Sequence, residues 1–532
     1  MIRDIRILDD HGQLVDVTCD HVSSPLVNGT EHRICFTAPR TFRAHCVSAS
    51  LDLVVEHFLE HGYQSWSTVR RTTPQDTRFE RAEAPRWFRS QMLADRESAG
   101  AELAGETFLV HSRGVAGFLT QLTSFGRLRV ARDGSVEAQW ILDDVLVEAG
   151  QRVELDALWI AGGQPGPLYA TYAQISGEAM SARLGTAVPT VWCSWYQYFG
   201  DITANEIREN ASIAVAHGIE VIQIDDGWQS EIGVWSDVAP TWGEPMSTLA
   251  GEIRALGATA GIWSAPFLAI EGGSLAVAHP QWLVRNEAGD PTTALFHDGW
   301  GGKIFALDTS NDDVLEHVRE TYRTMRSWGY DYFKIDFCHA AAAVGTRSNP
   351  RLTRAQIIRR GLQAVRDGIG DDAYLLGCGC PLLSAVGIVD AMRVSEDVAP
   401  HYEARQFFSG YEESTVSARN AIEASLLRAP LHARWFTLDA DCVLLRPVET
   451  ELNAHERLMI GEMVVATGGL LALSDRLSLY GPEEWRIFDS LRSRLDHQPR
   501  EVHQLFERDV ELFWSNSASR FNWDDRTFHV RN

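Results

Sequence analysis

The sequence lacks the features that mark several large classes of protein. Its eight cysteines are scattered over 532 residues, without the dense spacing of a secreted disulfide framework, so we expect free thiols. No run approaches the roughly 18 apolar residues that a membrane helix requires, and the segment MIRDIRILDDHGQ at 1–13 has no apolar core of signal-peptide type. These absences predict a cytoplasmic protein that does not associate with membranes.

Positive charge is also scarce relative to negative charge. Forty-eight basic residues face 72 acidic residues, and the resulting formal charge of −24 repels nucleic-acid phosphates. The segment GWGGK at 299–303 lacks the Ser or Thr of a phosphate loop, and no GxGxxG follows a strand-like run. The CGC at 378–380 has no second group at zinc spacing. We expect neither a nucleic-acid partner nor a cofactor, and a small molecule as the substrate.

What the chain does contain is ample material for folded domains. Hydrophobic residues make up 45% and charged residues 23%, as in a globular protein that folds throughout. Short β-rich runs alternate with turns as far as about residue 161, and the turn-rich GGQPGP at 162–167 follows them. We predict an N-terminal β-sandwich domain over 1–165.

The central part of the chain repeats a strand-then-helix pattern. From about residue 187, eight short apolar runs are separated by amphipathic, helix-like stretches, which favours a (β/α)8 TIM barrel. The eight runs are VPTVWCSWY, EVIQIDD, TAGIWSAPF, DYFKIDF, AYLLGCG, AMRVSED, ARWFTLDADC and GGLLALSD. We predict a multidomain α/β protein with the catalytic barrel at 166–480, and the last barrel helix with a small C-terminal β segment at 481–532.

Charged residues cluster at the ends of three of these runs. In DYFKIDF, Lys334 and Asp336 are two positions apart, so on a strand they point to the same face. The second run ends in two adjacent aspartates and the sixth carries an arginine and an aspartate. These residues are Asp225, Asp226, Arg393 and Asp397. Active sites of TIM barrels lie at the C-terminal ends of the strands, so these groups are predicted to ring the mouth of the barrel.

Less specific explanations exist for each of these groups. A buried Lys–Asp pair can simply satisfy itself, and Asp225 with Asp226 could start a turn. Several carboxylates could hold a divalent metal, but no histidine sits on these strand ends and a lysine lies alongside, so a metal is not expected. Converging charges suit a hydroxyl-rich ligand, and aromatic residues that can pack on sugar rings lie on the same segments. These aromatic residues are Trp192, Trp195, Tyr196, Trp228, Trp235 and Trp263, of which roughly a third to a half are expected to touch ligand.

Six motifs, in order, resemble those of the α-galactosidases of glycoside hydrolase family 36. They are WCSWYQYF, VIQIDDGWQ, GIWSAPF, DYFKIDF, LLGCGCPLL and RVSEDVAP, and the likeness runs from about residue 60 to about 475. The resemblance implies a nucleophile at Asp336 and an acid/base at Asp397, accompanied by Lys334 and Arg393. It also implies a substrate-binding set comprising Trp66, Trp195, Tyr196, Asp225, Asp226, Trp263, Lys334, Cys378 and Arg393.

The resemblance implies an exo-acting retaining α-galactosidase that cleaves raffinose- or melibiose-type oligosaccharides. In that chemistry the acid/base begins protonated, so its surroundings are expected to raise the pKa of Asp397. The sequence departs from the family pattern at Gly-Val-Trp 233–235, at Glu396 and at Tyr402. Two alternatives therefore stay open: an α-N-acetylgalactosaminidase and a galactosyl transferase. A sugar-binding protein without activity is disfavoured, because a binding module needs neither Asp336 nor Asp397 in place.

Overall fold

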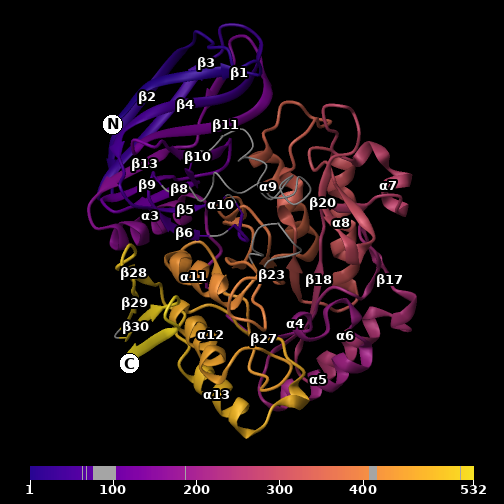
Figure 1. The fold of residues 1–532 in the computed structure, drawn as a ribbon. Helices are drawn as coiled ribbons and strands as arrows, with labels where there is room; N and C mark the ends of the chain where they lie inside the picture. Colours follow the sequence, from indigo (N-terminus) through magenta and orange to yellow (C-terminus); the bar gives the residue numbers. More distant parts are fainter. Residues whose placement is uncertain are drawn as a thin grey trace.

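A computed structural model describes residues 1–62, 64–67, 69–75, 103–185, 187–405, 416–515 and 517–531. Tyr63, in the segment HGYQSWS at 61–67 that contains Trp66, lies outside the described residues. The chain forms an N-terminal sandwich, a central barrel and a small C-terminal sheet (Figure 1). The predicted multidomain fold class is confirmed.

The N-terminal sandwich is built from one continuous 13-stranded sheet that folds over its own core. Its strands are β1 (Ile2–Asp9), β2 (Thr18–Leu26), β3 (Gly29–Thr37), β4 (Phe42–Val54), β5 (Phe58–His61), β6 (Val69–Thr72), β7 (Leu103–Glu106), β8 (Phe108–His111), β9 (Gly114–Phe118), β10 (Phe125–Val130), β11 (Ser135–Val147), β12 (Arg152–Glu154) and β13 (Leu158–Gly162). The long strands β4 and β11 pair antiparallel along most of their length. Aromatic and branched side chains such as Phe36, Trp140 and Leu158 fill the space between the layers.

The central barrel consists of short parallel strands that are almost entirely buried. They are β14 (Thr190–Cys193), β15 (Val221–Ile224), β18 (Thr259–Ser264), β22 (Tyr332–Ile335), β23 (Tyr374–Gly377), β24 (Ala391–Arg393), β25 (Thr437–Asp439), β26 (Cys442–Val443) and β27 (Leu471–Leu473). The segment β25 pairs with β24 and the segment β26 pairs with β27, so the two are halves of one interrupted seventh strand that closes the barrel. Side chains fill the interior and helices cover the outside, which explains why these runs are apolar on both faces.

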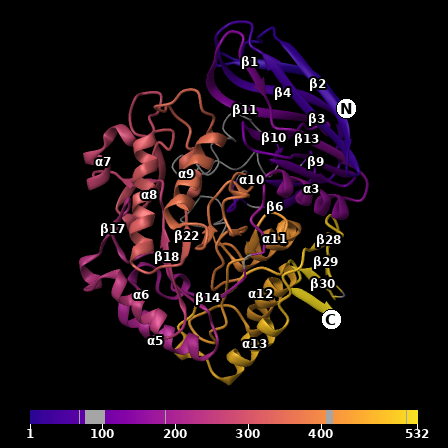
Figure 2. The same ribbon diagram turned by 180° about the vertical axis from the view of Figure 1, so that it is seen from behind.

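Helices surround the barrel (Figure 2). They are α4 (Trp195–Tyr198), α5 (Ala204–Ala216), α6 (Met246–Ala255), α8 (Asp312–Ser327), α9 (Arg354–Ile369), α10 (Leu382–Ala385), α11 (Ala418–Arg428), α12 (Ala454–Thr467) and α13 (Pro482–Ser493). Capping boxes fix where several of them begin: Thr203 with Glu206 starts α5, and Thr353 with Gln356 starts α9. No helix in the described ranges has both the length and the apolar character needed to cross a bilayer.

Three smaller units complete the described part of the chain. Between β18 and β22, an insertion contains α7 (Ser274–Ala278) and a three-stranded sheet of β19 (Leu268–Ile270), β20 (Thr293–His297) and β21 (Gly302–Ala306). A hairpin of β16 (Gln229–Glu231) and β17 (Val234–Val238) follows the second barrel strand. The C-terminal sheet contains β28 (Glu501–His503), β29 (Val510–Trp514), β30 (Ser517–Asn522) and β31 (Thr527–Arg531).

The helix α3 (Pro165–Ala179) joins the three parts. It contacts β9 of the sandwich and β28 of the C-terminal sheet, and in Figures 1 and 2 it lies between them. Glycines allow close approach at both ends of this helix: a Cβ on Gly166 would lie 2.1 Å from the carbonyl oxygen of Val502, and one on Gly177 would lie 2.0 Å from that of Arg434. One hydrophobic cluster accordingly runs from the sandwich face that includes Phe108 into the barrel and the C-terminal sheet.

Candidate active site

The fourth barrel strand, β22, places a lysine against a carboxylate that follows the second strand. Lys334 Nζ donates to Asp225 Oδ2 at 2.8 Å, and both side chains are buried. Gln223 Nε2 donates to the same oxygen at 2.7 Å. Burial lowers the pKa of Lys334, but the charge of Asp225 offsets that effect, so the pKa lies well above its usual value. The lysine is therefore a fixed cation, and the structure identifies Asp225 as its ion-pair partner.

The second aspartate of the pair, Asp226, faces the insertion. Gln229 Nε2 donates to its Oδ1 at 2.5 Å, and Trp300 Nε1 donates to its Oδ2 at 2.7 Å. Trp300 ends the 3-10 helix η5 (Asp298–Trp300), just before β21. Burial raises the pKa of Asp226, and although these two donors lower it, the net shift is upward. The insertion thus supplies part of the mouth of the barrel.

Asp336 lies one residue beyond the end of β22. The indole Nε1 of Trp263 donates to its Oδ2 at 3.1 Å, and the backbone N–H of Phe337 donates to its Oδ1 at 2.7 Å. Phe337 adopts a φ of 51°, in the left-handed region that residues other than glycine seldom occupy. Such strain is concentrated at functional sites. Both carboxylate oxygens of Asp336 therefore accept hydrogen bonds from N–H groups.

On the sixth strand, Arg393 contacts three carboxylates. Its Nη1 donates to Asp397 Oδ1 at 3.1 Å and its Nε to Asp439 Oδ2 at 3.1 Å, while its Nη2 lies 2.7 Å from Asp441 Oδ1. The side chains of Asp439 and Asp441 are 4% and 0% exposed, whereas that of Asp397 is 34% exposed. Asp397 is thus the carboxyl of this group that solvent or a ligand can reach.

The environment of Asp397 favours its protonated form. Burial is the main cause that raises its pKa; the charges of Arg393 and Lys334 lower it, and those of Asp336 and Asp225 raise it again. The net shift is upward, as the sequence predicts. The same interactions show that the charges of the second, fourth and sixth strands act on a single carboxyl group.

A loop of the sandwich, residues 64–67, reaches this mouth. The ring of Trp66 packs edge-on against Phe337 at a centroid distance of 4.8 Å, and its backbone N–H donates to Gln64 Oε1 at 2.7 Å. The guanidinium of Arg428 holds the loop, because its Nη1 and Nη2 donate to the carbonyl oxygens of Ser65 and Ser67 at 2.8 and 3.0 Å. Trp66 therefore adjoins the residue that follows Asp336.

The remaining predicted residues line the same end of the barrel. Tyr196 is buried and its hydroxyl donates to Asp441, while Trp195 is partly exposed and packs edge-on against Phe199. Cys378 is 1% exposed, and the charges of Asp336, Arg393, Lys334 and Asp397 all act on its pKa, which burial raises. Two other tryptophans of the barrel, Trp192 and Trp228, are core residues whose indoles donate to backbone oxygens.

Three residues of this site were not singled out from the sequence. Trp300 lies in the insertion, where GWGGK was considered only as a phosphate loop. Asp439 and Asp441 lie inside the run counted as the seventh strand, ARWFTLDADC. The spacing of Asp439 and Asp441, two apart at the end of a strand, is the same signal that pointed to Lys334 and Asp336.

Two of the departures from the family pattern have structural partners away from the carboxylates. Tyr402 donates through its hydroxyl to the carbonyl oxygen of Trp523 at 2.6 Å, which ties a barrel loop to the C-terminal sheet. Glu396 is 1% exposed and lies close enough to Arg428 for its charge to act on that guanidinium. Burial lowers the pKa of Arg428 to about 10, and the charge of Glu396 opposes part of this decrease. In the hairpin, Gly233 has a φ of 103° and Trp235 packs edge-on against Trp263.

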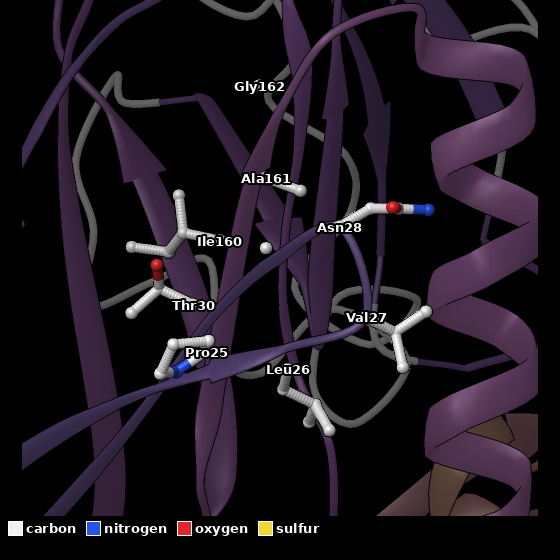
Figure 3. Close-up of a pocket in the computed structure, with 9 residues that line it drawn as sticks. Pro25, Leu26, Val27, Asn28, Thr30, Ile160, Ala161 and Gly162 are labelled. Atoms are coloured by element: carbon white, nitrogen blue, oxygen red, sulfur yellow. The ribbon is translucent and has the colours of Figure 1, made fainter.

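Two further features bear on ligands. A hollow of about 530 Å³ on the sandwich is lined by segments 25–30 and 160–162, whose side chains are apolar apart from Asn28 and Thr30 (Figure 3). It offers no acid, base or nucleophile and lies away from the strand ends of the barrel. Within the described ranges, no three or more His, Cys, Asp or Glu side chains are grouped as metal ligands.

Comparisons with known proteins agree with the motifs. Residues 179–368 match the Melibiase family. The chain is 27% identical over 164 residues to the bifunctional α-galactosidase/sucrose kinase AgaSK of Mediterraneibacter gnavus, which is 29% of this chain and 17% of that protein. It is 25% identical over 192 residues to the α-galactosidase AgaA of Geobacillus stearothermophilus, which is 34% of this chain and 25% of that protein. The matched stretches thus cover a quarter or less of these two relatives.

Solved structures extend the likeness to nearly the whole chain. The α-galactosidase TtGalA of Thermus thermophilus in complex with p-nitrophenyl α-D-galactopyranoside has a TM-score of 0.76 at 26% identity, covering 96% of this chain and 100% of that one. The same protein in complex with stachyose has a TM-score of 0.73 at 28% identity, covering 90% and 100%. The family 36 α-galactosidase AgaA shares the fold, with a TM-score of 0.63 at 13% identity, covering 97% and 80%. These findings confirm the resemblance of this chain to the α-galactosidases of glycoside hydrolase family 36.

Proposed function

We propose that this protein is a retaining exo-α-galactosidase that hydrolyses terminal α-galactosyl residues of raffinose- or melibiose-type oligosaccharides. The observation that carries the proposal is the contrast between two carboxyl groups at one end of the barrel. Asp336 is surrounded by N–H donors, while the surroundings of Asp397 raise its pKa. Pairs of carboxyl groups whose environments differ in this way divide the roles of nucleophile and acid.

In the proposed first step, a carboxylate oxygen of Asp336 attacks the anomeric carbon of the galactosyl unit. The bond from that carbon to the glycosidic oxygen breaks, and Asp397 gives its proton to the departing oxygen. The product is a galactosyl ester of Asp336. Water then attacks the same carbon, Asp397 accepts a proton from it, and Asp336 leaves as the carboxylate.

Three charged groups at the same end of the barrel would supply sugar recognition. The two carboxylates Asp225 and Asp226 and the ammonium of Lys334 can hydrogen-bond the 4- and 6-hydroxyls of galactose. The 4-epimer would lose the hydrogen bonds of its 4-hydroxyl to these groups, and sites built to hydrogen-bond a substrate hydroxyl discriminate by roughly 10⁴-fold. The complexes of the Thermus thermophilus relative with stachyose and with a nitrophenyl galactoside support this class of substrate.

The proposal is tested with a mechanism-based fluorogalactoside and mass spectrometry of the trapped chain. We expect the label on Asp336, near-complete loss of turnover in Asp336→Ala, and α-galactose as the first sugar seen by proton NMR, because two displacements restore the anomeric configuration. A label on Asp225 or Asp397, or β-galactose as the first product, would refute the mechanism.

A panel of nitrophenyl α-glycosides separates the related activities. Preference for the 2-acetamido sugar would identify an α-N-acetylgalactosaminidase, and release of nitrophenol without free galactose in the presence of acceptor sugars would identify a transferase. Galactoside cleavage with almost no glucoside cleavage is the expected result.

A further inference from the structure

The interruption of the seventh barrel strand is unusual in its backbone. Between β25 and β26, Asp441 has a φ of 74° and is fully buried, and its N–H donates to Asp439 Oδ1 at 2.9 Å. Residues other than glycine seldom adopt this region, and such strain persists only where the surrounding structure imposes it. The break in the strand directs the carboxylate of Asp441 toward the sixth strand.

Four donors surround this buried carboxylate. Its Oδ1 lies 2.7 Å from Arg393 Nη2 and accepts the N–H of Cys442 at 2.7 Å. Its Oδ2 accepts the N–H of Val398 at 2.8 Å and the hydroxyl of Tyr196. Two of these donors lead directly to Asp397: Val398 follows it in the chain, and Arg393 donates to its Oδ1. No contact of Asp441 itself with a substrate is required for it to act on Asp397.

We propose that Asp441 is a positioning residue for Asp397, which it fixes through the backbone of Val398 and through Arg393, and whose proton its negative charge helps to retain. The inference rests on the proposed function, because it assigns Asp397 the role of proton donor. Asp441 would thereby fix the direction in which Asp397 donates its proton and help Asp397 to hold that proton until the leaving group accepts it.

Charged and titratable groups face Asp441 from each neighbouring element. They are Arg393 on β24, Asp397 after it, Asp439 on β25, Tyr196 on α4 and the thiol of Cys442 on β26. Burial and the charges of Asp397 and Asp439 raise the pKa of Asp441 to about 6, against the opposing effect of Arg393. The single cation Arg393 thus contacts three carboxyl groups. Because like charges repel, an ionised Asp441 disfavours the ionisation of Asp397.

The chain contains a matched control for this carboxylate. Asp475, beyond the eighth strand, is also fully buried and also receives one arginine, one tyrosine hydroxyl and two backbone N–H groups. These donors are Arg446 Nη1 at 2.8 Å, Tyr480 at 2.6 Å, and the N–H groups of Leu445 and Arg446 at 2.6 and 3.0 Å. Asp441→Asn and Asp475→Asn therefore remove the same charge and disturb the same kinds of bonds, but only the first contacts Arg393 and Val398.

The decisive readouts are the pH profile of kcat/KM and the dependence on leaving group. In Asp441→Asn we expect the basic limb to move to lower pH by about half to one unit, because Asp397 then loses its proton more easily. Turnover of melibiose should fall roughly 10- to 100-fold, and that of nitrophenyl α-galactoside much less, because a nitrophenolate leaves without a proton. Asp475→Asn should keep the wild-type profile and lose activity equally on both substrates, if at all.

A second pair of variants covers the case in which Asp441→Asn does not fold. Tyr196→Phe removes one donor to Asp441, and Tyr480→Phe removes the matching donor to Asp475. Only Tyr196→Phe should shift the basic limb, in the same direction and by less. A wild-type limb in Tyr196→Phe, and in Asp441→Asn where that variant folds, would overturn the role of Asp441. Absence of galactose release by the wild-type chain would instead refute the proposed function.

Discussion

At the scale of single residues, Trp300 shows how a side chain outside the barrel strands can tune the site. Its indole donates to Asp226, a carboxyl whose pKa is already raised by burial. Removing this donor raises the pKa of Asp226 further, so the ionised form is reached only at higher pH. A hydroxyl of the sugar would then lose a charged acceptor over the acidic part of the pH range.

We therefore expect Trp300→Phe to increase KM for nitrophenyl α-galactoside by about tenfold with kcat little changed, since hydrogen bonds to charged groups contribute about 1.5–3 kcal/mol. The increase should be largest at low pH, and the acidic limb of kcat/KM should move upward. Steady-state kinetics across pH measure both effects. The control is Trp282→Phe in the same insertion, whose ring stacks on His279 instead. Equal KM values in the two variants would contradict the assignment.

The charged residues of the site could be predicted from the sequence for a physical reason. A strand alternates its side chains with period two, and parallel strands end at one rim, so Lys334 and Asp336 had to share a face near the other strand ends. The partner of Lys334 could not be predicted, because Asp225 is 109 positions away and its approach depends on barrel closure. The contact of Trp300 with Asp226 could not be predicted for a similar reason, since the position of Trp300 depends on how the insertion folds against the barrel.

At the scale of elements, the sandwich loop 64–67 depends on a buried arginine. Arg428, at the end of α11, donates to the carbonyl oxygens of Ser65, Ser67 and Val394. It thereby fixes the loop to the end of the sixth strand, so that the position of Trp66 relative to Phe337 is set by the barrel. The loop is a part of the mouth only while this arginine holds it.

Replacement of Arg428 by methionine should release the loop. We expect a several-fold rise in KM together with a loss of stability of about 3–5 kcal/mol, because buried carbonyl groups lose their partners. The control is Arg500→Met: Arg500 is equally buried but donates to the carbonyl oxygens of Ala466 and Val465 on α12, not to those of the loop. Urea unfolding should show a similar loss in both, whereas only Arg428→Met should change KM. A KM change in neither would show that the loop does not bind substrate.

Most barrel strands and helices could be predicted from the period and length of the hydrophobic runs, but the interruption of the seventh strand could not. The run ARWFTLDADC has the composition of one strand, and the structure divides it at Asp441. Local propensity gives no sign of this break, because the left-handed residue is held by contacts from Arg393 and Val398. Tertiary interactions decide the backbone there.

At the scale of the whole molecule, the domain boundaries at 165 and 480 remain predictions from the sequence. One hydrophobic core extends across both of them. The hydrophobic cluster that includes Phe108 of the sandwich continues through Tyr172 of α3 to Trp435 of the barrel. A surface shared in this way would be exposed if either part unfolded alone. The sandwich and the barrel should therefore unfold together.

Calorimetry of the full chain should show a single cooperative transition. Gly177→Ala should lower its midpoint, because the new Cβ would meet the carbonyl oxygen of Arg434. Gly251→Ala in α6 is the matched helix variant: nothing lies within 4 Å of its Cβ, and a gain of about 0.5–1 kcal/mol is expected. Two separate transitions, or a shift confined to one of them, would show that the sandwich unfolds independently.

The lysine of the site also has a consequence for handling the protein. Of 48 basic residues only two are lysines, Lys303 and Lys334, and the second is buried against Asp225. Lys303 lies on β21 in the insertion with its side chain 54% exposed. Among the side chains, a reagent that couples to lysine amines can therefore attach a dye or a solid support only at Lys303. Activity retained after such coupling would show that the reagent does not reach the amine of Lys334.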